Sequence, residues 1–410
     1  MSKRDLSGRA SVLVLEATGY RRRTVWRDTV LHGFFGLCGP GDVLPGGFPE
    51  RNPDHPLTRF AGWLFRREYD ALSYVVDWRE ALERSPLTEC TVVNVHNLPQ
   101  FSAALKRIAR YDLIVVLHSA TGDSMDALNR AAPRLAARKG KLAVFIGNEY
   151  CLMGRKQDFL RESRADYVLS QLPQEGAEWL YEEAALSAGT RALSVPHGLN
   201  PNLYRPGPLD SRPVDVGFVG AFYHLVVGDK ERTNAIEWFQ FNGAAKGLAC
   251  DIRQGNIPRD RWSAFLRSCK AIVGAESNTY YLQRRGEAVN KALAYLETHP
   301  SPSFKEVFDH AFADARGCID GKIISSRHFE PIGTKTAQVL VEGRYNGILL
   351  PDEHYIPLAK DLSNVDEAVE KLKDGSLRRR MVERTYEYVM DAHTYDHRIH
   401  DMLKTVLSDS

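Results

Sequence analysis

The sequence has 410 residues, enough for two domains of ordinary size. Hydrophobic residues make up 43% and charged residues 26%, the composition of a folded globular protein and not of a disordered one. The formal net charge of +2 argues against a global field that attracts nucleic acid or another polyanion, so any anion site has to be local.

The six cysteines are scattered and form no CxxC pair, which argues against a zinc site or a redox motif. We expect them to be free thiols in a reducing compartment. The first residues lack the apolar core of a signal peptide, and no apolar run approaches the roughly 20 residues that a membrane helix needs. The sequence therefore predicts a cytoplasmic protein without stable membrane insertion.

The first half of the chain alternates short β-branched runs with longer amphipathic stretches. Strands are predicted at residues 11–15, 91–95, 113–117, 142–146, 167–170 and 192–195, and helices at 124–138 and 175–185. This alternation is typical of parallel strands with helices on both faces of the sheet. The uninterrupted apolar run at 113–117 suits a strand that is covered on both sides.

A proline-rich stretch between Pro196 and Pro213 then marks a domain boundary. The alternation restarts with predicted strands at 214–220, 271–274, 338–341 and 347–350, and with helices at 259–269, 304–313, 365–373 and 376–390. We predict an α/β protein with two Rossmann-like, doubly wound domains that face each other across a cleft. The N-terminal domain is placed at 1–205 and the C-terminal domain at 206–385, and a final helical segment at 386–410 is expected to cross back to the first domain.

Several common catalytic motifs are missing from the sequence. No GxGxxG follows the first predicted strand, residues 333–336 lack the upstream glycines of a P-loop, and neither HExxH nor Asp-x-Asp occurs. A phosphate-bearing ligand would therefore have its charge met by Arg, Lys and helix N-termini without a bound metal.

Residues 195–206, with the sequence VPHGLNPNLYRP, lie at the predicted boundary. A glycine permits a sharp turn after the strand, and the prolines stiffen the linker that follows. We interpret His197 as a turn residue that bonds backbone groups.

The strand at 214–220 ends in Gly220, and Arg232 follows near the start of the next helix. Glycine at this position lets backbone N–H groups approach a phosphate, and Arg232 can supply positive charge. The alternative is an ordinary strand–loop–helix joint with a solvated arginine.

The third segment, residues 325–340, has the sequence SSRHFEPIGTKTAQVL. Ser325 or Ser326 can cap a short helix in it. Arg327, Glu330 and Thr334 share one face of that helix through their spacing of three and four residues. An internal Arg–Glu pair is the alternative reading of the same spacing.

Together with the stretch DAHTYDHR at 391–398, these three segments resemble glycosyltransferase family four and its relatives. The similarity is closest to the spore-maturation-protein-like (CgeB-like) branch and covers roughly residues 113–398. It implies a GT-B fold and a metal-independent, retaining enzyme that moves a sugar from a nucleoside diphosphate sugar to a hydroxyl-bearing acceptor, with no cofactor beyond the donor. The nucleotide-sugar contacts that the resemblance implies are Gly220, Arg232, Ser326, Arg327, Glu330 and Thr334, with Arg327 on the diphosphate and Glu330 on the ribose hydroxyls.

One position departs from the family pattern, in which a first glutamate precedes Glu330 by eight positions. The corresponding residue here is Lys322, so the hydroxyls of the donor sugar need other partners. Backbone groups of residues 320–325 are the candidates for this contact.

In the N-terminal half, His118 follows the predicted strand 113–117 directly, and Asn148 and Glu149 follow the strand 142–146. The resemblance implies a catalytic role for His118, where an imidazole can orient a hydroxyl or accept its proton. Asn148 and Glu149 are predicted to contact the acceptor, which is left open as a glycan, a lipid or a small molecule. A hydrogen-bonded histidine at the strand end, with no chemical role, is the alternative for His118.

Two other functions fit the same residues. A sugar-nucleotide epimerase would share the nucleotide site and need no acceptor pocket. A non-catalytic protein that binds a nucleotide or a glycan is the second alternative, favoured by the missing first glutamate.

Overall fold

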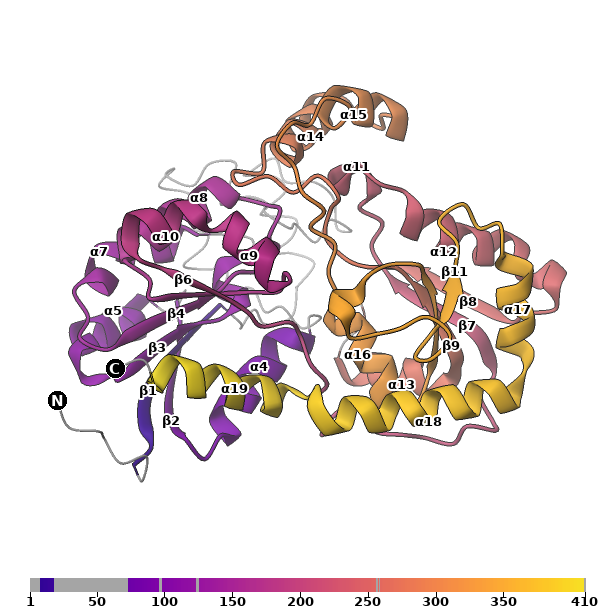
Figure 1. The fold of residues 1–410 in the computed structure, drawn as a ribbon, viewed down its shortest axis with the longest axis horizontal. Coiled ribbons are helices and arrows are strands. Elements are labelled where there is room, and N and C mark those ends of the chain that lie inside the picture. Colours follow the sequence, from indigo (N-terminus) through magenta and orange to yellow (C-terminus); the bar gives the residue numbers. More distant parts are fainter. Residues whose placement is uncertain are drawn as a thin grey trace, which may run out of the picture. The chain divides into compact units, whose positions relative to one another are not determined.

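A computed structural model describes residues 8–17, 73–95, 98–122, 125–255, 257 and 259–408 (Figure 1). The chain divides into two compact units. The first holds the chain up to Ser170, with Tyr181–Leu193 and the residues from Met402 onward. The second holds Gln171–Leu180 and Ser194–Asp401.

The first unit contains a six-stranded sheet in the order β2-β1-β3-β4-β5-β6. Strand β1 pairs in parallel with both β2 and β3, and Val12 lies opposite Cys90 on one side and Leu113 on the other. Every residue of β3 is buried, because helices cover both faces of the sheet. The strands are β1 Ala10–Glu16, β2 Thr88–Asn94, β3 Leu113–Val116, β4 Lys141–Phe145, β5 Tyr167–Ser170 and β6 Arg191–Ser194. The helices are α4 Ser73–Arg84, α5 Leu98–Lys106, η1 Ile108–Arg110, α6 His118–Thr121, α7 Asp126–Ala136, α8 Met153–Ser163 and α10 Glu182–Ala188.

The second unit contains a five-stranded sheet in the order β11-β10-β9-β7-β8. Its strands are β7 Val214–Gly220, β8 Cys250–Gln254, β9 Cys269–Gly274, β10 Ala337–Val341 and β11 Ile356–Leu358, and all neighbouring pairs are parallel. The first strand of the unit, β7, lies between β8 and β9. Strand β8 is added on one side of β7, and β9, β10 and β11 are added on the other, so the winding of the chain reverses between β7 and β9. In open parallel sheets, ligands bind beyond the carboxyl ends of the strands at this switch point.

Helices flank this sheet on both faces. They are α11 His224–Val227, α12 Glu231–Asn242, η2 Ala244–Lys246, α13 Arg259–Ser268, α16 Ser326–Gly333, η3 Tyr345–Gly347, α17 Val365–Lys373 and α18 Gly375–Ala392. Helix α9 Gln174–Leu180 also belongs to the second unit, and α19 Tyr395–Ser408 runs past the division between the units at Met402.

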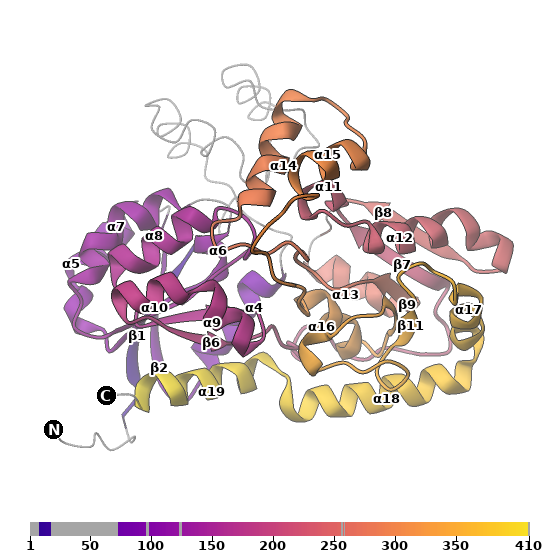
Figure 2. The same cartoon turned by 45° about the horizontal axis from the view of Figure 1, so that its top comes forward.

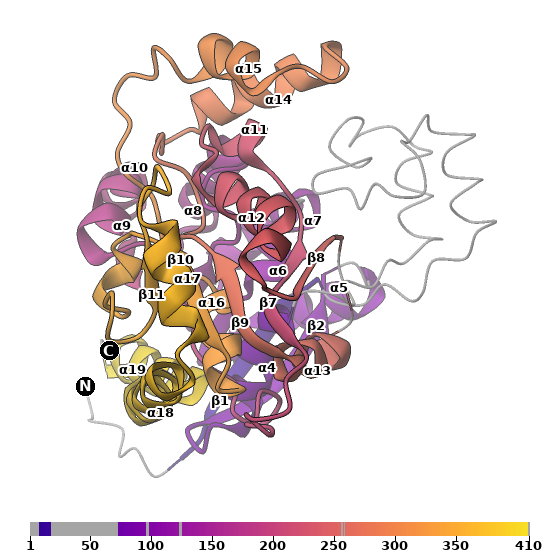
Figure 3. The ribbon, with the colours of Figure 1, turned by 90° about the vertical axis from the view of Figure 1, so that its right-hand side faces the viewer.

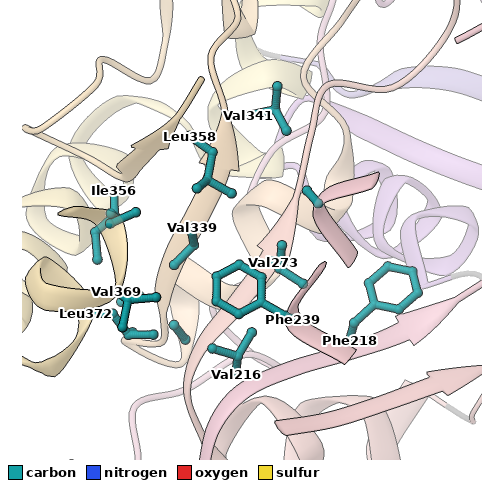
Figure 4. Packing of buried hydrophobic residues seen from close by; sticks show 14 of the residues in the cluster. Val216, Phe218, Phe239, Val273, Val339, Val341, Ile356, Leu358, Val369 and Leu372 are labelled. Atoms are coloured by element: carbon teal, nitrogen blue, oxygen red, sulfur yellow. The ribbon is translucent and has the colours of Figure 1, made fainter. Parts of the chain in front are cut away.

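Alternate residues of the strands build two separate cores. Val216, Val273 and Val339 face α12 and α17, where they meet Phe239 and Leu372 (Figure 4). Their neighbours Val219, Ile272 and Leu340 face the opposite way, toward α13, α16 and the end of α18. Each such side chain contributes roughly 1.5–3 kcal/mol when it is fully buried, so the strand alternation holds helices on both faces.

Helices α14 Glu287–Thr298 and α15 Phe304–Ala311 form a hairpin that stands off the sheet of the second unit (Figures 2 and 3). Two antiparallel bridges close its base, between Ser277 and Ile323 and between Leu282 and Ile319. A capping box at Ser303 starts the second helix of the hairpin.

The segment after β6 runs beside the start of α19, within the second unit. Leu199 forms a parallel bridge to Thr394 and accepts the amide of Tyr395. A Cβ at Gly198 would lie 2.8 Å from the carbonyl carbon of Thr394, so this close approach of two backbones requires glycine. His197 is buried with its Nδ1 3.3 Å from the hydroxyl of Tyr395, and its carbonyl accepts from Arg398.

The two doubly wound α/β sheets confirm the fold predicted from the sequence, whereas their arrangement across a cleft stays a prediction. Three local predictions need correction. No strand forms at 347–350, where positive φ angles at Tyr345, Asn346 and Gly347 make a tight turn, and the edge strand is instead Ile356–Leu358. The helix expected at 175–185 breaks at Tyr181 into α9 and α10. Strand β8 is absent from the prediction because its residues are partly exposed and mostly polar.

Two further observations bear on the bulk properties. No helix in the described residues combines the length and apolarity required to cross a lipid bilayer. In the same residues, five cysteines are free thiols, namely Cys90, Cys151, Cys250, Cys269 and Cys318.

Candidate functional site

A pocket opens at the switch point of the second unit, beyond the carboxyl ends of β7 and β9. The end of β10, the first turn of α16 and one residue of α13 complete it. Its lining residues are Phe218, Val219, Tyr223, Arg232, Trp262, Ile272, Val273, Gly274, Ala275, Ser277, Ser325, Arg327, His328 and Leu340. The pocket thus lies where the strand order of an open parallel sheet predicts a ligand site.

Arg232 comes from the first turn of α12. Its guanidinium lies 5.1 Å from the ring centre of Phe218 and 4.7 Å from that of Tyr223, so the cation rests between two aromatic faces. Its Nη1 donates to the carbonyl of Ala221 at 3.3 Å. These contacts hold the side chain at the pocket, although it remains partly exposed.

Arg327 enters from the other side, on the first turn of α16. Its guanidinium lies 4.3 Å from the ring centre of Trp262, and its Nη1 donates to the carbonyl of Val219 at 3.4 Å. The two arginines thus bind carbonyls on either side of Gly220, one residue before it and one after it. Each guanidinium is oriented by an aromatic ring and keeps N–H groups for a ligand.

Gly220 makes room for this arrangement. A Cβ at this position would lie 2.9 Å from Cζ of Phe218 and 3.3 Å from Nη2 of Arg232. The ring and the guanidinium stacked on it would both have to move, so glycine is required here for packing and not for a positive φ.

His328 ties the start of α16 to the end of β9. Its Nδ1 accepts the amide of Ser325 at 2.9 Å, and its Nε2 lies 3.1 Å from the carbonyl of Ala275, to which it donates. This pair of bonds requires the neutral imidazole with the proton on Nε2. Burial lowers the pKa of His328 to about 4, and the nearby charge of Arg232 acts in the same direction.

The electrostatic character of the pocket follows from these groups. It is lined by two guanidiniums and a neutral imidazole, and no Asp or Glu is among the described residues that line it. The first turn of α16 also lines the pocket, so the positive end of its dipole lies there. Such a pocket is suited to an anion with several oxygens, and the rigid forks of two arginines match phosphate groups.

Glu330, on the same helix, does not line the pocket. Its side chain is buried, and Oε2 accepts the indole N–H of Trp262 at 2.6 Å. A ribose contact through this carboxylate, as the resemblance implies, requires a change in the side chains around it. The structure thus brings Glu330 next to Trp262, a pairing that the helical spacing does not reveal.

Ser326 and Thr334 are also buried. Ser326 is the first residue of α16, and Ser325 occupies the N-cap position. Thr334 follows the far end of the helix, where its carbonyl accepts from the buried Arg212 and its hydroxyl contacts Thr336. The structure therefore brings Arg232 and Arg327 to the pocket, leaves Gly220 next to Val219 of the lining, and places Thr334 at the opposite end of α16.

Lys322, at the position of the first family glutamate, has an acidic partner. Its Nζ binds Oδ2 of Asp229 at 2.6 Å and the carbonyl of Asn278 at 3.2 Å, and it lies 4.6 Å from the ring centre of Tyr280. Both side chains of the ion pair are almost fully buried. The lysine is thus held in a buried ion pair within the second unit.

In the first unit, His118 begins α6 directly after β3. It is 1% exposed and packs against Trp78 and Phe145, whose ring centres lie 5.5 and 4.7 Å from its own. The side chain therefore lies in an aromatic enclosure at the carboxyl edge of the first sheet.

Asn148 and Glu149 lie in the turn after β4. Asn148 has a positive φ of 48°, and its carbonyl accepts from the buried Lys156. Glu149 is buried and accepts from Ser170 and Tyr181, each at 2.6 Å. Its carboxylate is thus bonded within the first unit.

Sequence reasoning did not assign Phe218, Tyr223, Trp262 or His328 to the site, although Phe218, Tyr223 and His328 lie in segments that it singled out. Trp262 lies 65 positions before Arg327 in a helix with an ordinary amphipathic pattern. Its contact with Arg327 arises from tertiary packing, and no local pattern in the sequence predicts it.

Comparisons with known proteins bear on the family and on the fold. Residues 251–404 match the family model described as glycosyl transferase-like. No curated protein matches the sequence significantly. Among solved structures, an alpha-glucosyltransferase in complex with UDP and a DNA containing an HMU base has a TM-score of 0.53 at 11% identity, covering 98% of this chain and 100% of that one.

An alpha-glucosyltransferase with UDP-glucose and DNA containing an abasic site has a TM-score of 0.52 at 10% identity, with coverage of 98% and 100%. At such low identity these likenesses concern the fold, whose two parallel α/β sheets agree with this chain. The family match over residues 251–404 includes α16, β9 and β10, which line the pocket. The chain thus has a fold of the GT-B type, and its residues 251–404 are similar in sequence to a glycosyl transferase-like family.

Proposed function

We propose that this enzyme transfers a glycosyl group from a UDP-sugar to a hydroxyl-bearing acceptor, and that the pocket of the second unit binds the donor diphosphate. The observation that carries the proposal is the pair of arginines, Arg232 and Arg327, held on either side of Gly220 at the switch point. UDP as the nucleotide is supported by the two similar glucosyltransferases, which are complexes with UDP and with UDP-glucose.

Glycosyl transfer requires stabilisation of the leaving group, which is the nucleoside diphosphate. As the bond between sugar and diphosphate breaks, negative charge grows on the diphosphate oxygens. Two oriented guanidiniums and a helix N-terminus stabilise that charge more in the transition state than in the bound donor, which lowers the barrier. In this proposal the arginines serve in place of a divalent metal, and retention of the anomeric configuration follows from the family resemblance.

The acceptor side belongs to the first unit in this proposal. His118 would orient or deprotonate the acceptor hydroxyl, and Asn148 and Glu149 would contact the acceptor. The positions of these residues after β3 and β4 support the assignment. The burial of His118 and Glu149 means that the acceptor has to reach them through rearranged side chains. Placement in the spore-maturation-protein-like branch and in the cytoplasm are further parts of the proposal.

Titration calorimetry with UDP tests the donor site. Arg327→Ala and Arg232→Ala should each weaken binding by about 10- to 100-fold, because each removes a charge-assisted bond worth about 1.5–3 kcal/mol. Arg261→Ala is the matched control, since Arg261 is exposed on α13 and does not line the pocket. UDP affinity that is unchanged in both pocket variants would remove the site assignment.

Product analysis tests the reaction. UDP-glucose is incubated with and without a panel of glycan, lipid and small-molecule hydroxyl acceptors, with added EDTA in a parallel series. Release of UDP only in the presence of an acceptor supports transfer, whereas a changed sugar nucleotide without acceptor indicates an epimerase. Binding without any turnover indicates a non-catalytic protein. Loss of activity in EDTA would contradict metal independence, and the anomeric proton signals of the product report retention or inversion.

A further inference from the structure

Three side chains form a connected chain that leads from the wall of the second unit's pocket into the interior. The indole N–H of Trp262 donates to Oε2 of Glu330 at 2.6 Å, and the guanidinium of Arg327 lies 4.3 Å from the ring centre of Trp262. Arg327 and Trp262 line the pocket, and Glu330 lies behind them.

The indole is held from two directions. Its N–H is fixed by the carboxylate of Glu330, and the ring stacks on Phe265 with centres 5.6 Å apart and planes 19° from parallel. A ring with one face against Phe265 and its N–H committed to a buried carboxylate has little freedom to rotate. Arg327 therefore rests on a surface whose orientation is set by Glu330.

The charge of Glu330 also acts through the ring. A cation is attracted to the electron-rich face of an indole. When the indole N–H donates to a carboxylate in a low-dielectric interior, the ring is polarised and its face becomes more negative. Loss of the carboxylate therefore weakens the contact to Arg327 as well as the orientation of the ring.

We infer that Glu330 is a positioning residue for the diphosphate contact, which fixes Trp262 as the platform that orients Arg327. This inference rests on the proposed function, since it assumes that Arg327 binds the donor diphosphate. It differs from the ribose role that the family resemblance implies for the same carboxylate. The two roles predict different dependence on the nucleoside part of the ligand.

The test compares the affinity for inorganic pyrophosphate with that for UDP in titration calorimetry. Trp262→Phe and Glu330→Ala should each weaken both ligands by the same factor, about three- to tenfold for a cation–π contact that loses its orientation. The ratio of the two dissociation constants therefore stays at the wild-type value. A ribose contact would instead weaken UDP in Glu330→Ala and leave pyrophosphate unchanged, which would overturn the inference.

One conservative variant and two control variants separate positioning from a loss of folding. Glu330→Gln keeps an oxygen that accepts the indole N–H, so most of the pyrophosphate affinity should return. Trp238→Phe and Glu383→Gln are matched controls outside the pocket and should leave both affinities unchanged. If Glu330→Ala fails to fold, Trp262→Phe decides, because unchanged pyrophosphate affinity in that variant contradicts the platform role.

Failure of the proposed function gives a different pattern. In that case the wild-type protein binds neither UDP nor pyrophosphate, or Arg327→Ala binds both as the wild type does. Failure of the inference alone leaves Arg327→Ala defective while Trp262→Phe and Glu330→Ala bind pyrophosphate normally.

Discussion

Acidification should destabilise the protein through His328, and the size of the effect can be worked from the structure. The imidazole is 3% exposed, its Nδ1 accepts the amide of Ser325, and its Nε2 donates to the carbonyl of Ala275. A second proton on Nδ1 would face the Ser325 N–H and lose that bond. Protonation in the folded state is therefore opposed by burial, by geometry and by the charge of Arg232.

The pKa of His328 is lowered from the ordinary value of 6.5 to about 4. Between these two pH values the unfolded chain binds more protons than the folded one, so stability falls as the pH decreases. The contribution is complete above pH 6.5 and is lost progressively down to pH 4. At about 1.4 kcal/mol per pKa unit, a change from pH 7 to pH 5 should cost about 2 kcal/mol of unfolding free energy.

Urea unfolding at a series of pH values measures this effect, with His328→Asn as the comparison. Other histidines with a lowered pKa that His328 does not influence, such as His393 at about 4, are present in both proteins and cancel in the difference. The variant should be less stable at pH 7 and should lose about 2 kcal/mol less than the wild type on going to pH 5. Parallel curves for the two proteins would refute the assignment of a buried, neutral His328.

Three substitutions give further predictions, each measured by urea unfolding at neutral pH. Gly343→Ala should cost about 1–3 kcal/mol, because the new Cβ would lie 2.7 Å from Cδ of the buried Glu276; unchanged stability would contradict this packing. Lys322→Ala should cost about 3–5 kcal/mol by leaving Asp229 buried without its partner, and Asp229→Asn with Lys322→Met should recover most of it. Phe241→Ser should stay within about 0.5 kcal/mol, because the side chain is 74% exposed, and a larger loss would reveal an unrecognised contact.

Much of the fold could be predicted from local patterns. Strands β3, β5, β7 and β10 each lie within one or two residues of their predicted bounds, and β3 is a continuous apolar run in the sequence. Such a run predicts a buried strand because a strand covered on both faces needs apolar side chains at every position. The turn that replaces the predicted strand at 347–350 has the same apolar composition, since Ile348 and Leu349 are buried, but its backbone is set by positive φ angles. Composition alone does not distinguish a buried turn from a short buried strand.

Some residues of the candidate site could likewise be predicted from local sequence patterns, and others could not. Gly220, Arg232 and Arg327 could be found from the sequence, because a strand end, a helix start and a cation leave a local pattern. Trp262 could not, since its place beneath Arg327 depends on how α13 packs against α16.

Glu330 is the clearest example of what the sequence alone does not determine. Helical spacing alone places its side chain near Arg327, on the side where a nucleotide would bind. Tertiary packing decides that the carboxylate is buried and bonded to the indole of Trp262. The periodicity of the sequence determines which residues share a helix face. Which segment packs against that face depends on residues distant in the chain, as Trp262 is from Glu330, and only the tertiary structure brings them together.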